Sequence, residues 1–204
     1  MSIAVIDYGA GNLKSVTKAL HHLGFANEIV SDPGELERFD AMILPGVGAF
    51  PKCMEALRSR GMDAEILRQT KKEKPLLGIC LGMQMLLDSS EELGRSEGLG
   101  LIPGTVRRID TDLKLPHIGW NSLQIVHGNP LTRDLTDGDY VYFVHSFCAT
   151  VTEETDLALT TDYGTTVTAM VARDSVFGCQ FHPEKSGPVG LKILKAFCEL
   201  PVQG

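Results

Sequence analysis

Hydrophobic residues in the first half of the chain gather into short runs that are separated by segments with a helical period. The short runs predict strands, and they span residues 2–6, 25–30, 41–44 and 75–79. The intervening segments predict helices at residues 12–23, 51–60, 62–73 and 81–88. Because strands and helices alternate in this way, the pattern predicts a parallel sheet with helices on both faces.

The second half has a different pattern, in which short β-rich runs are separated by turns. These runs predict additional strands, partly antiparallel, at residues 104–109, 140–148, 157–161 and 165–172. A last helix is predicted at residues 189–200, with an apolar face that packs on the sheet. The whole chain, residues 1–204, has the length of one α/β domain, and we expect one mostly parallel central sheet with antiparallel additions.

Cys80 lies where a predicted strand meets a predicted helix, and it has Gly78 and Gly82 two positions away on either side. This is the cysteine version of the nucleophile elbow, in which larger side chains at the glycine positions would collide with the sharp turn. The start of a helix also presents free N–H groups and a partial positive charge, which favour the nucleophilic thiolate. We therefore predict a catalytic cysteine. The alternative is a buried structural cysteine beside a tight turn.

A candidate base occurs near the end of the sequence, in His182-Pro183-Glu184. In a continuous strand, alternation places Gln180, His182 and Glu184 on one face, and Pro183 keeps the segment extended and out of a helix. Glu184 would then orient the imidazole while the other ring nitrogen faces the nucleophile. This pattern predicts a triad of Cys80, His182 and Glu184. A core histidine satisfied by its neighbours is the alternative.

Residues 78–84 together with 182–186 resemble the triad-type, class I glutamine amidotransferases. Five further segments make the chain similar to the glutaminase subunits of imidazole glycerol phosphate synthase, an enzyme of histidine biosynthesis. These segments are residues 7–13, 44–50, 98–104, 116–121 and 142–147. The resemblance extends from residue 3 to about residue 198, and it implies a flavodoxin-like class I glutamine amidotransferase fold. One departure is Phe147, where the resemblance leads us to expect tyrosine.

The loop of Gly46, Val47 and Gly48 follows a predicted strand. Beside a nucleophile, such a loop aims a backbone N–H at the oxyanion that develops during acyl transfer, and the N–H of Leu81 is a second donor. An ordinary glycine-rich turn is the alternative. By the class I resemblance, the reaction is hydrolysis of L-glutamine through a cysteine thioester.

Gln84 lies four residues after Cys80 and shares its helix face. The resemblance implies that Gln84 contacts the substrate glutamine, and that Glu92 meets its α-ammonium group; a solvated loop acid is the alternative for Glu92. Ser146 and Phe147 match a backbone ledge that holds the substrate. For His145, which precedes this ledge, we favour a structural histidine over a second base.

The resemblance also implies a partner, a cyclase subunit with a (β/α)8-barrel fold that forms a heterodimer with this chain. The cyclase would use the ammonia to make imidazole glycerol phosphate and an aminoimidazole carboxamide ribonucleotide. Asn12, Trp120, Tyr142 and Lys185 would face it, with a core position as the alternative for Trp120. Two other functions stay open, a glutaminase subunit of another synthase and a catalytically silent scaffold that binds a partner.

Composition narrows the function classes further. A net charge of −7 argues against a nucleic-acid surface. The sequence has no phosphate-binding or metal-binding motif, so we expect neither a cofactor nor a metal. No apolar stretch approaches 18 residues and no signal peptide is recognised, so we expect no membrane association. The cysteines are scattered and suit a reducing, cytoplasmic compartment; they are Cys53, Cys80, Cys148, Cys179 and Cys198.

Overall fold

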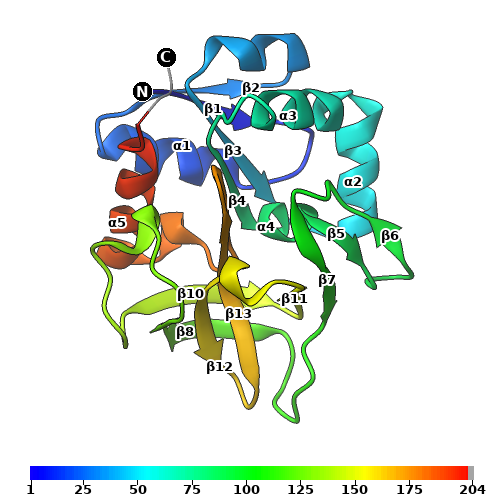
Figure 1. Ribbon diagram of the computed structural model, residues 1–204, viewed down its shortest axis with the longest axis vertical. Helices are drawn as coiled ribbons and strands as arrows, with labels where there is room; N and C mark the ends of the chain where they lie inside the picture. Colours follow the sequence, from blue (N-terminus) through cyan, green and yellow to red (C-terminus); the bar gives the residue numbers. More distant parts are fainter. Residues whose placement is uncertain (202–204) are drawn as a thin grey trace.

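The structure, a computed structural model, describes residues 1–201 and is built around an eight-stranded sheet (Figure 1). The strand order is β2-β1-β3-β4-β14-β13-β12-β9. The first five strands are parallel: β2 (Ala26–Val30), β1 (Ser2–Ile6), β3 (Ala41–Gly46), β4 (Leu76–Cys80) and β14 (Val176–Cys179). Antiparallel pairing then adds β13 (Thr166–Arg173), β12 (Leu157–Asp162) and β9 (Gln124–Ile125). The predicted α/β fold with a mostly parallel sheet is confirmed.

Helices cover both faces of this sheet (Figure 1). Alternation along β1 sends Ile3 and Val5 into one hydrophobic cluster and Ala4 and Ile6 into another, which explains why the strand is apolar from Ile3 to Ile6. The first cluster includes buried residues of α1 (Leu13–His22) and α5 (Gly187–Cys198). The second includes buried residues of α2 (Phe50–Ser59), α3 (Met62–Thr70) and α4 (Leu81–Met85).

Two smaller sheets lie beside the central one. The four-stranded sheet has the order β11 (Phe147–Val151), β7 (Ile102–Arg108), β5 (Leu87–Ser90) and β6 (Ser96–Glu97). The other is a ribbon of two antiparallel strands, β8 (His117–Ser122) and β10 (Tyr140–His145). One face of this ribbon buries His117 and His145, whereas the opposite face exposes Ile118, Trp120 and Tyr140.

Three local predictions are wrong. The helix predicted at residues 81–88 ends at Met85, because the carbonyls of Met85, Leu86 and Leu87 accept hydrogen bonds from the backbone of residues 99–102 instead of continuing a helix. The run 140–148 is two strands, not one: Ser146 separates β10, which pairs with β8, from β11, which pairs with β7. Tertiary pairing therefore overrides local preference at both places.

The third concerns the segment around Pro183. Strand β14 ends at Cys179, and Pro183–Lys185 form a 3-10 turn, η4, so Pro183 begins a turn and does not keep the chain extended. This agrees with the ability of proline to occupy the first position of a helical turn. Other predicted boundaries differ by up to three residues. No helix within residues 1–201 has the length and apolar character needed to cross a membrane.

Candidate active site

Cys80 lies at a sharp turn between β4 and α4, with φ 55° and ψ −111°. A Cβ atom on Gly82 would lie 1.8 Å from the carbonyl oxygen of Leu44, and one on Gly78 would lie 2.7 Å from backbone atoms of Gly82. Only glycine fits at these positions, as the elbow pattern predicted. The turn also places Cys80 directly beside Gly46 of the neighbouring strand β3.

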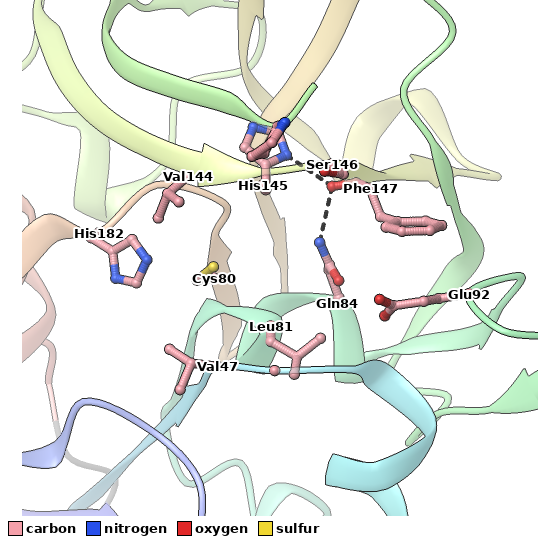
Figure 2. Close-up of a pocket in the computed structure, with 12 residues that line it drawn as sticks. Val47, Cys80, Leu81, Gln84, Glu92, Val144, His145, Ser146, Phe147 and His182 are labelled. Carbon is pink, nitrogen blue, oxygen red and sulfur yellow. Dashed lines mark hydrogen bonds between the residues drawn. The ribbon is translucent and has the colours of Figure 1, made fainter. Parts of the chain in front are cut away.

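Cys80 opens into a cavity of about 390 Å³ at the carboxyl end of the parallel strands. This is the edge at which open α/β sheets bind their ligands. Figure 2 shows the His182 ring on one side of Cys80, and Gln84 with Glu92 on the other. The cavity is lined by Val47, Gly48, Cys80, Leu81, Gln84, Glu92, Pro116, Val144, His145, Ser146, Phe147 and His182. Two predicted site residues do not line it: Gly46 lies buried beneath the loop, and Glu184 lies behind His182.

His182 and Glu184 form a buried ion pair, in which His182 Nδ1 is 2.9 Å from Glu184 Oε1. The η4 turn brings the two side chains together, and the backbone N–H of His182 donates to the carbonyl of Tyr142 on β10. Burial alone would lower the pKa of His182, but the neighbouring Cys80 and Glu184 outweigh it and raise the pKa to about 9. The arrangement therefore favours the imidazolium form of His182.

The loop of Gly46, Val47 and Gly48 is held from below by helix α2, since the Cys53 thiol lies 3.5 Å from the Val47 carbonyl and donates to it. Gly48 has φ +116°, a conformation that favours glycine. The side chain of Val47 is 44% exposed, and Val47, Gly48 and Leu81 all border the cavity. The loop thus lies beside Cys80, where the sequence predicted an oxyanion donor.

Gln84 is nearly buried, and its amide nitrogen donates to two acceptors, the Phe147 carbonyl at 3.0 Å and Gln180 Oε1 at 3.0 Å. Figure 2 draws the first of these bonds as a dashed line. The Gln180 amide nitrogen in turn lies 3.9 Å from Cys80 Sγ. Sequence alternation pointed to Gln180 but assigned it no role. The missing information was tertiary, because β14 lies beside β4 in the sheet.

Glu92 reaches the cavity from the loop after β5, and its Oε2 accepts a hydrogen bond of 2.8 Å from the Phe50 backbone at the start of α2. Ser146 and Phe147, the predicted substrate ledge, lie on the cavity wall where β10 gives way to β11. Pro116 and Val144 complete the wall and were not among the predicted site residues.

His145 has partners on both ring nitrogens, with Nδ1 2.8 Å from the Phe147 carbonyl and Nε2 3.1 Å from His117 Nδ1. Burial lowers the pKa of His145 to about 4, so the ring is neutral at pH 7. These contacts fit the structural histidine that the sequence favoured over a second base.

Two of the four predicted partner residues lie in direct register on the ribbon, where Trp120 pairs with Tyr142 and their ring centroids are 6.2 Å apart. Trp120 is 55% exposed, so the alternative of a core tryptophan is wrong. Lys185 is exposed on the η4 turn, and Asn12 lies just before α1. Among the other cysteines, Cys53, Cys179 and Cys198 are buried as expected, whereas Cys148 is only half-buried.

Comparison with known proteins gives consistent matches over nearly the whole chain. The family model described as glutamine amidotransferase class-I matches residues 4–200. The imidazole glycerol phosphate synthase subunit HisH of Caldanaerobacter subterraneus subsp. tengcongensis is 50% identical, over 97% of this chain and 98% of that protein. The subunit of the same name from Streptococcus gordonii is 53% identical, over 96% of this chain and 94% of that protein.

Solved structures show the same fold at lower identity. A crystal structure titled glutamine amidotransferase has a TM-score of 0.74 at 18% identity, with 97% of each chain covered. The structure of PurLQS from Thermotoga maritima has a TM-score of 0.76 at 22% identity, with 96% of each chain covered.

Proposed function

The chain belongs to the class-I glutamine amidotransferases, and on that premise we propose that it acts as the glutaminase subunit of an imidazole glycerol phosphate synthase in histidine biosynthesis. Relatives that are about 50% identical over nearly their full length support this synthase over any other. The single observation that carries the chemistry is Cys80, which lies at an elbow in a cavity of about 390 Å³ beside a buried histidine–carboxylate pair.

Cys80 attacks the side-chain carboxamide of L-glutamine as a thiolate. The raised pKa of His182 supports this step, because a more basic imidazole accepts the proton of the thiol more readily. Glu184 holds Nδ1 and stabilises the positive charge on the ring, while the other ring nitrogen serves the reaction. The tetrahedral intermediate places its negative oxygen near the backbone N–H groups of the Gly46–Gly48 loop and of Leu81.

His182 then gives its proton to the departing nitrogen, which leaves as ammonia, and a γ-glutamyl thioester remains on Cys80. Water attacks this thioester with His182 as general base, and glutamate is released as the thiolate is restored. One imidazole therefore acts as acid in the first half and as base in the second.

The rest of the cavity suits the other end of a glutamine molecule. Glu92 lies on the side of the cavity opposite His182, and we assign it to the α-ammonium group of the substrate (Figure 2). Gln84 contacts the substrate with its carbonyl oxygen, since both N–H groups of its amide are used by the protein. Ser146 and Phe147 provide the backbone ledge along which the substrate lies.

The relatives are named as subunits, which implies a partner, and we propose a cyclase with a (β/α)8-barrel fold that forms a heterodimer with this chain in the cytoplasm. Free ammonia is lost or protonated in bulk water, so a glutaminase benefits from direct transfer to a synthase. Exposure of Trp120 beside Tyr142 supports the assignment of the ribbon to this interface, together with Lys185 and Asn12. Large aromatic side chains often dominate such contacts.

A thiol-reactive glutamine analogue, 6-diazo-5-oxo-L-norleucine, tests the proposal when it is followed by mass spectrometry of tryptic peptides. We expect one adduct, on Cys80, and protection by excess L-glutamine. Cys198→Ala is a matched control that should label like the wild type. Absence of any adduct in the presence of the cyclase would favour a silent scaffold, whereas labelling without support for imidazole glycerol phosphate synthesis would favour another synthase.

A further inference from the structure

The carbonyl oxygen of Phe147 accepts two partly buried hydrogen bonds, drawn as dashed lines in Figure 2. His145 Nδ1 lies 2.8 Å away and Gln84 Nε2 lies 3.0 Å away. A carbonyl oxygen only accepts hydrogen bonds, so both neighbours must donate. This one atom therefore fixes the proton on Nδ1 of His145 and the orientation of the Gln84 amide.

The tautomer of His145 determines the tautomer of His117 on the ribbon. A neutral His145 with its proton on Nδ1 has a lone pair on Nε2, so His117 Nδ1, 3.1 Å away, must donate to it. His117 Nε2 is then an acceptor, and it faces the Asn121 amide nitrogen at 3.3 Å. Both imidazoles thus have a single tautomer that satisfies every neighbour.

The orientation of the Gln84 amide also determines the orientation of Gln180 beside Cys80. The second N–H of Gln84 donates to Gln180 Oε1, which turns the Gln180 amide nitrogen toward Cys80 Sγ, 3.9 Å away. The carbonyl oxygen of Gln84 remains as an acceptor on the side of the cavity where Figure 2 places Glu92. A continuous network of hydrogen bonds therefore runs from β8 to Cys80, with the Phe147 carbonyl as the acceptor on which its two arms converge.

The surroundings keep both histidines neutral. His117 is stacked between Phe143 and Tyr163, with ring centroids 4.7 Å and 4.0 Å away. Burial lowers the pKa of His117, and it lowers that of His145 to about 4. Protonation of either ring would set two N–H groups against each other, so the network of hydrogen bonds requires the neutral pair.

We propose that His117 and His145 are positioning residues whose fixed tautomers hold the Phe147 carbonyl, and through it the Gln84 amide, in the orientation that binds the substrate. The effect on substrate binding rests on the proposed glutaminase function, whereas the assignment of the tautomers does not. The competing explanation is that the two histidines only stabilise the fold. Both explanations predict a loss of stability in variants, so stability cannot separate them.

The first experiment measures the tautomers directly in the wild-type chain, by long-range ¹⁵N–¹H correlation spectra of the imidazoles at pH 7.5. We expect both His117 and His145 to have the proton on Nδ1. A proton on Nε2 of His145 would overturn the proposal. The result does not depend on glutaminase activity, so it stands even if the proposed function fails.

The second experiment compares variants in the complex with the cyclase, with glutamate formation as the readout. His145→Leu removes the donor to Phe147, and KM for glutamine should rise about tenfold, the effect of one hydrogen bond. His145→Asn keeps an amide N–H near the position of Nδ1, and KM should stay within about threefold of the wild type. Tyr163→Phe is the matched control, because it removes the bond from its hydroxyl to the Lys114 carbonyl yet keeps the ring that stacks on His117.

We expect Tyr163→Phe to leave KM unchanged. If His145→Leu and His145→Asn folded and had the KM of the wild type, with only their melting temperatures lowered, the histidines would be structural and the proposal would be wrong. A wild-type complex that did not hydrolyse glutamine would instead refute the proposed function.

Discussion

Replacement of Glu184 by glutamine tests the role of the carboxylate that faces His182. The side chain of Glu184 is fully buried and its Oε1 accepts from His182 Nδ1 at 2.9 Å. Glutamine has nearly the same shape, and its carbonyl oxygen can accept the same hydrogen bond. The substitution therefore removes the negative charge while the tautomer of the imidazole is retained.

The expected loss follows from the difference between two kinds of hydrogen bond. A bond to a charged group contributes about 1.5–3 kcal/mol, and a neutral one contributes about 0.5–1.5 kcal/mol. The difference of roughly 1–2 kcal/mol applies to the state with an imidazolium, so kcat for glutamine should fall about fivefold to thirtyfold. KM should change little, because Glu184 does not line the cavity.

The pH dependence of kcat gives an independent test of the role of Glu184. Burial opposes the charge on His182, while Cys80 and Glu184 raise its pKa to about 9. Without the charge of Glu184, the pKa must fall, and His182 loses its proton at lower pH. Since protonation of the leaving nitrogen needs this proton, the alkaline decline of kcat should move to lower pH in the variant.

The assay is glutamate formation by the complex with the cyclase between pH 6.5 and 10, with ammonia-driven synthesis as the measure of an intact partner. Glu199→Gln, which changes a surface acid paired with Arg133, is the matched control and should behave like the wild type. Unchanged kcat in Glu184→Gln, or an alkaline limb that moves to higher pH, would refute the assigned role.

Four further outcomes follow from the structure. Cys80→Ala should abolish glutamine-driven synthesis by the complex and leave ammonia-driven synthesis intact; substantial glutamine turnover would contradict its role as nucleophile. Trp120→Ala should weaken association with the cyclase about tenfold to hundredfold in a titration, with little change in melting temperature since the ring is 55% exposed; unchanged affinity would remove Trp120 from the interface. Gly82→Ala should fail to fold, because its Cβ would lie 1.8 Å from a backbone carbonyl, whereas Gly128→Ala, with open space around it, should fold normally. The pKa of His145 is lowered to about 4, so below pH 6.5 the unfolded chain binds more protons than the folded one. In urea unfolding, the free energy of unfolding of the wild type should therefore fall by about 2 kcal/mol more than that of His145→Asn between pH 7 and pH 5. An equal change in the two proteins would contradict the neutral state of His145.

Local chemistry explains what the sequence could predict. The elbow is visible because its glycines are required by contacts within a few residues of Cys80 and with the next strand. The pair of His182 and Glu184 was predicted correctly as neighbours, but for the wrong reason, since a turn and not an extended strand joins them. A short spacing can therefore be informative even where the secondary structure is misassigned.

Long-range pairing explains what the sequence could not predict. The hydrogen bonds of Gln84 and His145 meet at the Phe147 carbonyl, yet Gln84 on α4 lies 63 residues away from Phe147 in the sequence. The early end of helix α4 likewise depends on residues 99–102, whose backbone N–H groups donate to the carbonyls of residues 85–87. Neither feature has a local signature, because each partner alone is an ordinary residue.

The backbone of Cys80 has a consequence for how this protein tolerates change. A side chain at φ 55° and ψ −111° is in a region that glycine occupies far more readily, at a cost of about 1–3 kcal/mol. Cys80→Gly should therefore unfold at a higher temperature than Cys80→Ala, although we expect both to be inactive. The proposed nucleophile therefore lowers the stability of the fold, and a selection for thermostability alone would favour variants that have lost Cys80.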